Sequence, residues 1–270
     1  MTTSEKSATT SAATAKRYGI SKAKMKAIEE EDNEMNTLEA IKNSMPKDCW
    51  TLIKEVLPLS RRVLLYGPPG TGKTWAGTHA AERIYNITIT EDMSPSQLWG
   101  HFIFEGQDTK WHDGVASRAW KEGACLVINE VDAACGAVEV ALHAILDDPE
   151  FASQTLDDGH TIRPHKDFCC VATMNGMPED IPNALKDRFP VSINVDKPSK
   201  EAINALPKEY RKIVEKAYSR DGGPMLLTYR ALAEFCALIN NEISEASAAQ
   251  AVWGNSFVDV LTQIKLGNLE

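Results

Sequence analysis

The chain reads Gly67-Pro68-Pro69-Gly70-Thr71-Gly72-Lys73-Thr74 directly after the apolar run Val63-Leu64-Leu65-Tyr66. It matches the pattern G-x-x-x-x-G-K-[ST] in full, and the flanking residues predict a strand before the loop and a helix after it. In this setting the backbone N–H groups of a glycine-rich loop and the start of the helix surround a phosphate chain. The lysine reaches the outer phosphates, and the hydroxyl faces magnesium. The stretch therefore predicts a nucleoside triphosphate site; a plain glycine-proline turn is the alternative.

The composition of the chain limits its function class. With 270 residues it is long enough for one large domain or two modest ones. A formal net charge of −9 argues against a surface devoted to nucleic acid, which needs clustered Lys and Arg, although a local basic patch stays open. None of the six cysteines is spaced C-x-x-C, so we expect a reduced cytoplasmic protein without a zinc site. No apolar run is long enough for a signal peptide or a membrane span, and no membrane association is expected.

Further strands are predicted from short apolar or β-branched runs. These lie at residues 87–90, 125–128, 168–173 and 191–195, with helical patterns at 75–85, 94–100, 114–122 and 138–146 between them. This alternation predicts an α/β fold with a parallel five-stranded sheet sandwiched by helices. Two β-hairpins are expected at residues 101–112 and 154–166, each around a polar turn.

The chain divides into three predicted parts. Residues 1–36 are rich in Ser, Thr, Ala and charged groups, and we expect a flexible tail and linker. Residues 37–197 form the nucleotide-binding core, which opens with a pair of helices between about residues 38 and 57. Residues 198–270 show helical periodicity at 203–218, 227–239 and 246–264, with a turn at 221–224. They predict a small all-helical domain.

Polar side chains follow two of the predicted strands. Glu130 comes shortly after the apolar run at 125–128, and Asn175 follows the run at 168–173. Ligands of parallel sheets bind at the carboxyl ends of the strands, so both side chains are expected to face the phosphates. An ordinary acidic turn is the alternative for Glu130, and an Asn favoured by turn geometry is the alternative for Asn175.

Taken in order, these motifs make the chain resemble the AAA+ ATPases over about residues 38–250, and within them the MoxR-like branch, which carries an insert in its second helix. By this resemblance residues 67–74 and the adjoining Trp75 contact ATP, Glu130 polarises the attacking water, and Asn175 is the sensor 1 residue. Arg188, within Asp187-Arg188-Phe189, is similar to the arginine finger that reaches a neighbouring subunit's nucleotide. Arg230 is similar to the sensor 2 arginine, which approaches the γ-phosphate of its own subunit. The implied catalytic set is Lys73, Glu130, Asn175, Arg188 and Arg230. Surface ion pairs are the alternative for both arginines.

Asn129 departs from the family pattern, in which Asp precedes the catalytic Glu. The resemblance places Mg²⁺ beside Thr74 and residue 129. An amide there keeps an oxygen but lacks the negative charge of a carboxylate, so weaker metal binding and slower hydrolysis are expected. Asp132 lies one turn along and offers charge.

The resemblance implies an ATP-driven remodelling machine, assembled as a homo-oligomeric ring of six subunits and acting on a protein client. A partner with a von Willebrand factor A domain fits this branch. The negative net charge of the chain disfavours nucleic acid as a binding partner. The two hairpins are expected to face the central pore or the client. Two alternatives stay open. One is a ring or filament scaffold that binds ATP but hydrolyses it slowly, which Asn129 favours. The other is a P-loop kinase for a small molecule, which needs neither a neighbour's arginine nor a separate helical domain.

Overall fold

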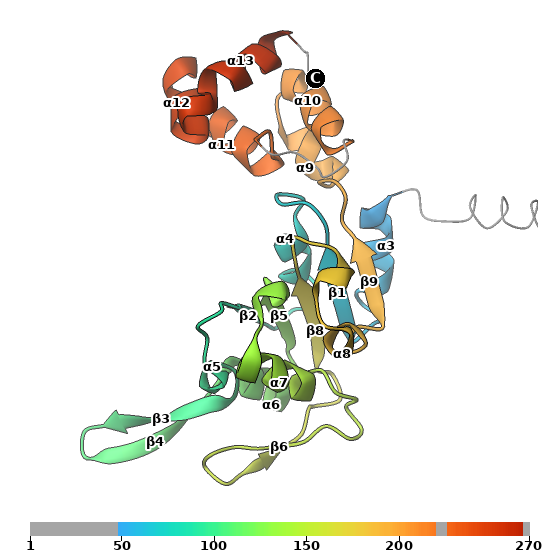
Figure 1. The fold of residues 1–270 in the computed structure, drawn as a ribbon, viewed down its shortest axis with the longest axis vertical. Coiled ribbons are helices and arrows are strands. Elements are labelled where there is room, and N and C mark those ends of the chain that lie inside the picture. The colour runs from blue at the N-terminus through green and yellow to red at the C-terminus, as the bar shows by residue number, and fades with distance from the viewer. Residues whose placement is uncertain (1–47, 220–225, 267–270) are drawn as a thin grey trace, which may run out of the picture. The chain divides into compact units, whose positions relative to one another are not determined.

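A computed structural model describes residues 48–219 and 226–266, which belong to one compact unit of the chain (Figure 1). The predicted tail at residues 1–36, the first of the two predicted N-terminal helices and the turn at residues 221–224 lie outside the described residues. The second predicted N-terminal helix is present as α3 (Cys49–Val56).

The described residues contain a parallel five-stranded sheet, as the sequence predicts. Its strand order is β2 (Ile84–Thr88), β5 (Cys125–Asn129), β8 (Cys169–Thr173), β1 (Arg62–Tyr66) and β9 (Val191–Asn194). β1 lies between β8 and β9, where Val63 is paired in register with Val171 on one side and Val191 on the other. The prediction for β2 was wrong in its bounds, because the strand begins at Ile84 rather than residue 87 and ends at Thr88.

Side chains of the central strands alternate between two hydrophobic clusters. Leu64 of β1 faces a cluster that includes residues of α5 (Pro95–Trp99), α6 (Val115–Glu122) and α7 (Gly136–Ile145). Val63 and Leu65 face the opposite cluster, with Trp50 of α3 and Ala76 of α4 (Lys73–Gly77). Because both faces of these strands are covered, their sequences are continuous apolar runs. The α/β sandwich is confirmed.

The helix after the glycine-rich loop is shorter than predicted. We expected it to continue to about residue 85, but α4 ends at Gly77. Glycine costs about 1 kcal/mol relative to alanine inside a helix. At this position it also allows a close approach to the sheet, since a Cβ on Gly77 would lie 3.0 Å from a methyl group of Val127. The chain then turns and enters β2 at Ile84.

The C-terminal part of the described chain is helical, with α9 (Lys200–Ala205), α10 (Lys208–Tyr218), α11 (Tyr229–Asn240), α12 (Glu245–Trp253) and α13 (Phe257–Leu266). Phe235 is fully buried in its own cluster, where it packs against Tyr210 and Trp253. Two predicted helices are each divided in two. Pro207 separates α9 from α10, and Gly254, with φ of 54°, follows α12. The domain boundary at residue 197 stays a prediction.

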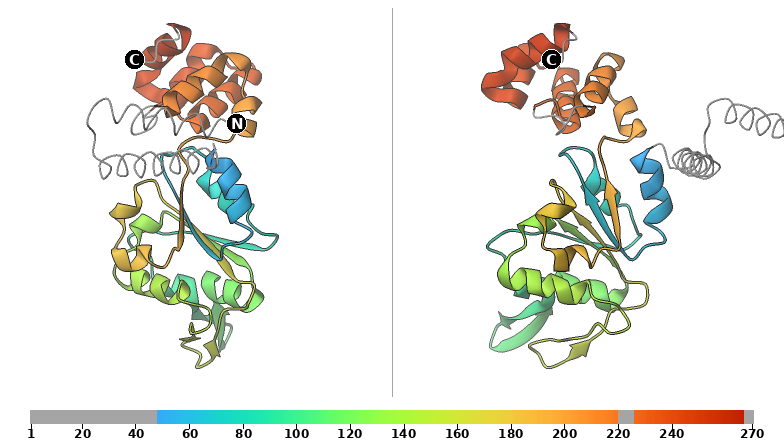
Figure 2. Two further views of the ribbon diagram at one scale, coloured as in Figure 1. Left: turned by 90° about the vertical axis from the view of Figure 1, so that its right-hand side faces the viewer. Right: turned by 45° about the vertical axis from the view of Figure 1, so that its right-hand side comes forward.

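Two antiparallel hairpins are also present, formed by β3 (Gly100–Glu105) with β4 (Asp108–Asp113) and by β6 (Gln154–Thr155) with β7 (Thr161–Ile162). Figures 1 and 2 show both of them at the end of the sheet away from α4. Phe104 is 86% exposed on the first hairpin, and Phe102 packs edge-on against Trp111. Both hairpin predictions are confirmed; the short α8 (Asn183–Lys186) lies between β8 and β9 in the chain.

Replacing Leu126 by alanine should lower the free energy of unfolding by about 2–5 kcal/mol. Leu126 is a fully buried residue of β5, the strand that precedes Glu130, so its truncation leaves a cavity in the hydrophobic cluster that it fills. Urea unfolding followed by circular dichroism measures the loss. Leu59→Ala is the matched control, because Leu59 is 86% exposed and its truncation should change the free energy by no more than about 0.5 kcal/mol. Equal losses in the two variants would contradict the assigned core.

Candidate functional site

The loop at residues 67–74 joins β1 to α4, and two of its glycines have positive φ and lie close to atoms from distant parts of the chain. Gly67 has φ of 129°, and a Cβ there would lie 2.8 Å from both the Asn194 side-chain oxygen and the Val195 carbonyl oxygen. Gly70 has φ of 74°, and a Cβ there would lie 3.0 Å from the Tyr218 hydroxyl. Positive φ and close approach together would strain any other residue, so the path of the loop favours glycine at both positions.

Lys73 lies inside this loop. Its side chain is buried and its Nζ donates to the carbonyl oxygens of Gly67 and Pro68, at 2.8 Å each. Burial lowers the pKa of Lys73 to about 8; the carboxylate of Glu130 opposes this shift, and the guanidinium of Arg230 adds to it. The ammonium group of Lys73 therefore donates to neutral carbonyl oxygens within the loop, and an anionic phosphate would be a stronger acceptor for it.

Thr74 and Asn129, the two residues expected to face a metal, bring two oxygen atoms together beside the loop. The Thr74 hydroxyl donates to Asn129 Oδ1 at 2.9 Å. Hydroxyl and amide oxygens are hard donors of the kind Mg²⁺ accepts, and Mg²⁺ usually binds through one or two protein groups, water and substrate phosphates. Within residues 48–219 and 226–266, no three His, Cys, Asp or Glu side chains gather as a metal site of their own. The two oxygens thus fit Mg²⁺ carried by a nucleotide.

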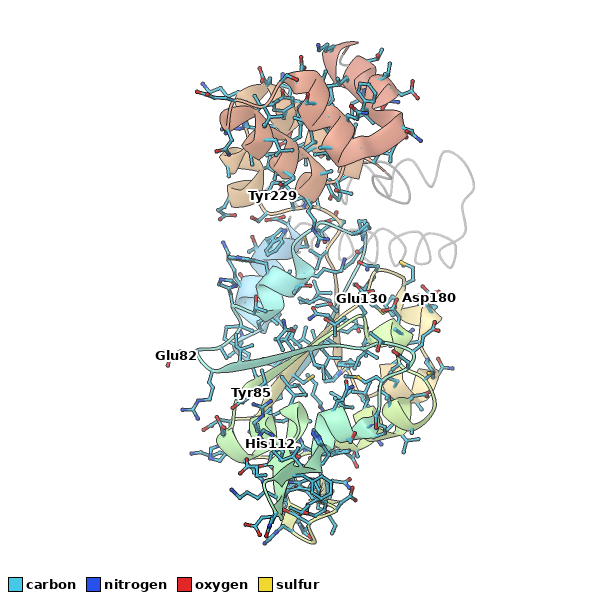
Figure 3. All side chains as sticks on the ribbon, turned by 90° about the vertical axis from the view of Figure 1, so that its left-hand side faces the viewer. Glu82, Tyr85, His112, Glu130, Asp180 and Tyr229 are labelled. Carbon is cyan, nitrogen blue, oxygen red and sulfur yellow. The ribbon has the colours of Figure 1, made fainter. Side chains whose placement is uncertain are left out.

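Glu130 and Asn175 meet at the carboxyl ends of two adjacent strands. Asn175 Nδ2 donates to Glu130 Oε1 at 3.3 Å. Glu130 has φ of 56° and ψ of 45°, a left-handed conformation that costs a non-glycine residue about 1–2 kcal/mol. Its carboxylate is exposed, and Figure 3 shows it at the edge of the sheet away from His112 and the first hairpin. The structure brings together the two strand-end residues that the sequence singles out.

The two predicted arginines have different surroundings. Arg230, in the first turn of α11, lines a cavity with Gly70, Thr71 and Gly72, close enough to Lys73 to affect its pKa. Arg188 follows α8 and forms an ion pair with Asp147 of the same chain through Nη1 and Oδ1. Arg230 thus joins the loop, whereas Arg188 contacts Asp147 and its role toward a neighbouring subunit stays a prediction.

The cavity has a volume of about 690 Å³ and is lined by loop residues and by aromatic side chains. Trp75 is 57% exposed there and stacks on His79, with ring centroids 4.2 Å apart. Sequence reasoning included Trp75 but missed Trp50 and Tyr229, which also line the cavity. An aromatic residue in an amphipathic helix resembles any core residue, so no sequence signal distinguished them.

Tyr218 was also missed. Its hydroxyl donates to the carbonyl oxygen of Pro69 at 3.0 Å and accepts the backbone N–H of Tyr229 at 3.1 Å. It links the glycine-rich loop to the first turn of α11, where Arg230 lies. Buried tyrosines are common in helical cores, so the sequence held no sign of this second contact.

A protein-family model described as "AAA domain (dynein-related subfamily)" matches residues 62–189, which include the loop, Glu130, Asn175 and Arg188. Residues 62–189 form an AAA domain. Protein NorQ of Paracoccus denitrificans is 36% identical over 129 residues, 46% of this chain and 47% of NorQ. The denitrification regulatory protein NirQ of Stutzerimonas stutzeri is 33% identical over 42% of each chain, and protein CbbQ of Hydrogenophilus thermoluteolus is 29% identical over 53% of this chain and 56% of CbbQ.

The family match and these relatives agree with the resemblance of residues 62–189 to the AAA+ ATPases. The matched part spans about half the length of the curated relatives. Among solved structures, NtrX from Brucella abortus in complex with ADP aligns with a TM-score of 0.52 at 14% identity, over 88% of this chain and 61% of that one. That likeness shows the fold of the AAA domain and its helical continuation.

Across the part of the chain that the structure describes, no helix has the length and apolar character needed to cross a membrane.

Proposed function

We propose that the protein is an ATP hydrolase that assembles into a ring and uses ATP to remodel a protein client. The contact between Asn175 and Glu130 carries the proposal, because it holds a carboxylate at the strand ends, close enough to Lys73 to affect its pKa. A loop that only binds phosphate does not require that pair. Membership of the AAA+ ATPases supports hydrolysis in general.

The nucleotide would occupy the cavity beside the loop. The backbone N–H groups of residues 70–74 and the ammonium of Lys73 bind the phosphates, while Trp75 lines the cavity where a base or ribose can contact it. Thr74 and Asn129 would hold Mg²⁺, which neutralises charge on the phosphate oxygens when bound. Glu130 orients water and accepts its proton, and Asn175 fixes the carboxylate. Arg230 faces the outer phosphate in its own subunit.

Assembly would complete the site through Arg188. An arginine finger contributes on the order of 10³–10⁵ in rate, so an isolated subunit would be nearly inactive. A contact that joins the finger side of one subunit to the nucleotide side of the next repeats around an axis, and it gives a ring where the rotation closes or a helical filament where it does not. We propose a cytoplasmic assembly. As the family resemblance implies, it would have six subunits, a protein client and a partner with a von Willebrand factor A domain. The net charge of −9 disfavours nucleic acid as the client.

Client capture tests the remodelling part of the proposal. Tagged Glu130→Gln protein with ATP should retain client proteins, because a ring that binds ATP without hydrolysing it stays closed on them. Lys73→Ala, which loses the ammonium of the loop, is the control and should retain none. If the same proteins bind both variants equally, stable client capture by the ATP-bound ring is not the function.

A slow-turnover scaffold is the second candidate, and two observations favour it. Asn129 lacks the charge of the family's Asp, and Arg188 is engaged by Asp147 within its own chain. Such a protein would form rings or filaments with ATP but show the same slow hydrolysis with and without Glu130. Electron microscopy and steady-state phosphate release on one sample separate the two candidates.

ATP affinity should depend on pH through Lys73. Its pKa of about 8 means that the ammonium is present below pH 8 and is lost as the pH rises above it. Phosphate binds the protonated form, so affinity should be nearly constant from pH 6.5 to 7.5 and should fall by up to about tenfold per pH unit above 8. Titration with a fluorescent ATP analogue at pH 7, 8 and 9 measures it.

The Lys73→Arg variant is the matched control for this titration, because a guanidinium stays charged across the whole range. Whatever the absolute affinity of the Lys73→Arg variant for the ATP analogue, that affinity should not decline above pH 8. An unchanged wild-type affinity between pH 7 and 9.5, or an equal decline in the arginine variant, would show that Lys73 does not cause the pH dependence.

A further inference from the structure

The side-chain amide of Asn129 is enclosed by hydrogen-bonding partners on all sides. Asn129 is 6% exposed at the end of β5. Its Oδ1 accepts from the hydroxyls of Thr74 at 2.9 Å and Thr173 at 3.2 Å. Its Nδ2 donates to Asn86 Oδ1 at 2.6 Å and to the backbone carbonyl oxygen of Ile87 at 3.3 Å. Every polar atom of the amide is therefore used.

These partners fix which way the amide points. The Ile87 carbonyl can only accept, so the NH₂ of Asn129 must face β2. The oxygen then faces the loop side, where Thr74 and the predicted Mg²⁺ lie. The hydroxyls of Thr74 and Thr173 can donate or accept and would tolerate either orientation. The orientation is thus decided on the β2 side of Asn129, and Asn86 provides the shorter of its two contacts.

We propose that Asn86 is a positioning residue that holds the oxygen of Asn129 toward Thr74 and the metal. This inference rests on the proposed function as a Mg²⁺-dependent ATP hydrolase. Asn86 lies on β2, the edge strand of the sheet, and its Oδ1 accepts from Asn129 Nδ2. It acts through Asn129. When a residue that hydrogen-bonds to a metal-facing side chain is replaced, metal affinity typically falls by 10–100-fold.

The same geometry accounts for an amide at position 129. An Asp there would place a carboxylate oxygen against the Ile87 carbonyl, at the 3.3 Å that Asn129 Nδ2 now occupies as a donor. Two acceptors at that distance repel each other and have no proton to share. With Asn, the β2 side receives a donor and the metal side keeps an oxygen. The side-chain NH₂ of Asn129 is therefore matched to the two acceptors that β2 presents to it.

The experiment compares Asn86→Leu with Asn86→Asp. Leucine removes the acceptor and excludes water at similar volume, whereas aspartate keeps an acceptor for Asn129 Nδ2. Thr88→Val, on the same exposed edge of β2, is the control for general effects on the strand. For each variant the Mg²⁺ concentration at half-maximal hydrolysis is measured. The Mg²⁺ dependence of fluorescent ATP-analogue binding provides a readout that does not need turnover.

Asn86→Leu should raise both Mg²⁺ requirements by about tenfold or more, with analogue affinity in EDTA unchanged. Asn86→Asp and Thr88→Val should stay within about threefold of wild type. Melting temperatures show whether the leucine variant folds, and Asn86→Ala replaces it if it does not. A wild-type Mg²⁺ requirement in the leucine or alanine variant, or an equal rise in the aspartate variant, overturns the role of Asn86. Wild-type protein that binds no analogue with or without Mg²⁺ would instead refute the proposed function itself.

Discussion

Replacing Glu130 by glutamine should reduce ATP hydrolysis by about 100-fold or more while ATP still binds. Glutamine keeps an oxygen that can accept from Asn175 Nδ2, so the local contact survives. It cannot take a proton from water, so the general-base step is lost. Phosphate release at protein concentrations where assemblies are present measures the rate, and a fluorescent ATP analogue measures binding.

The control for this substitution is Glu82→Gln, which makes the same chemical change at an exposed position before β2 (Figure 3). Its rate should stay within about twofold of wild type, as expected for an exposed residue away from the site. A wild-type rate no higher than that of Glu130→Gln would refute the hydrolase proposal and leave the slow scaffold as the better description. A loss of analogue binding in Glu130→Gln would mean that the residue supports the loop rather than the chemistry.

Much of this site could be predicted because it lies where strands end. A buried parallel strand is a continuous apolar run, so the first polar residues after it mark the carboxyl edge of the sheet. This reasoning placed Glu130 and Asn175 at that edge, and in the structure Asn175 Nδ2 donates to Glu130 Oε1 at 3.3 Å. It also gave the order of motifs from which the AAA+ resemblance was drawn, which the family match at residues 62–189 confirms.

What the sequence could not supply is the set of partners that come from distant elements. The acceptors of Asn129 lie on β2, 42 and 43 residues away in the chain, and their register is visible only once the sheet is built. From residue type, Asn129 was expected to be a weakened Asp. The end of α4 at Gly77 was missed for a similar reason, since the close approach of Val127 that favours glycine there is a tertiary contact.

Replacing Arg188 by alanine should lower hydrolysis by on the order of 10³-fold, the lower end of what arginine fingers contribute. The same substitution breaks the ion pair with Asp147, so a structural role within the chain has to be separated from a role toward a neighbour. Asp147→Ala makes this separation, because it breaks the same ion pair and keeps the guanidinium. An exposed or half-exposed ion pair contributes about 0–1 kcal/mol, so Asp147→Ala should fold normally and retain hydrolysis.

Mixing the two inactive variants provides the decisive form of this prediction. In a ring assembled at random from equal amounts of Arg188→Ala and Glu130→Gln, about a quarter of the interfaces pair an intact Glu130 site with an intact Arg188 from the neighbour. Hydrolysis should therefore rise to about a quarter of the wild-type rate, although each variant by itself is inactive. If Arg188 acted within its own chain, every subunit would carry one defect and mixing would restore nothing. Absence of recovery in mixed rings of confirmed composition would thus assign Arg188 to its ion pair with Asp147.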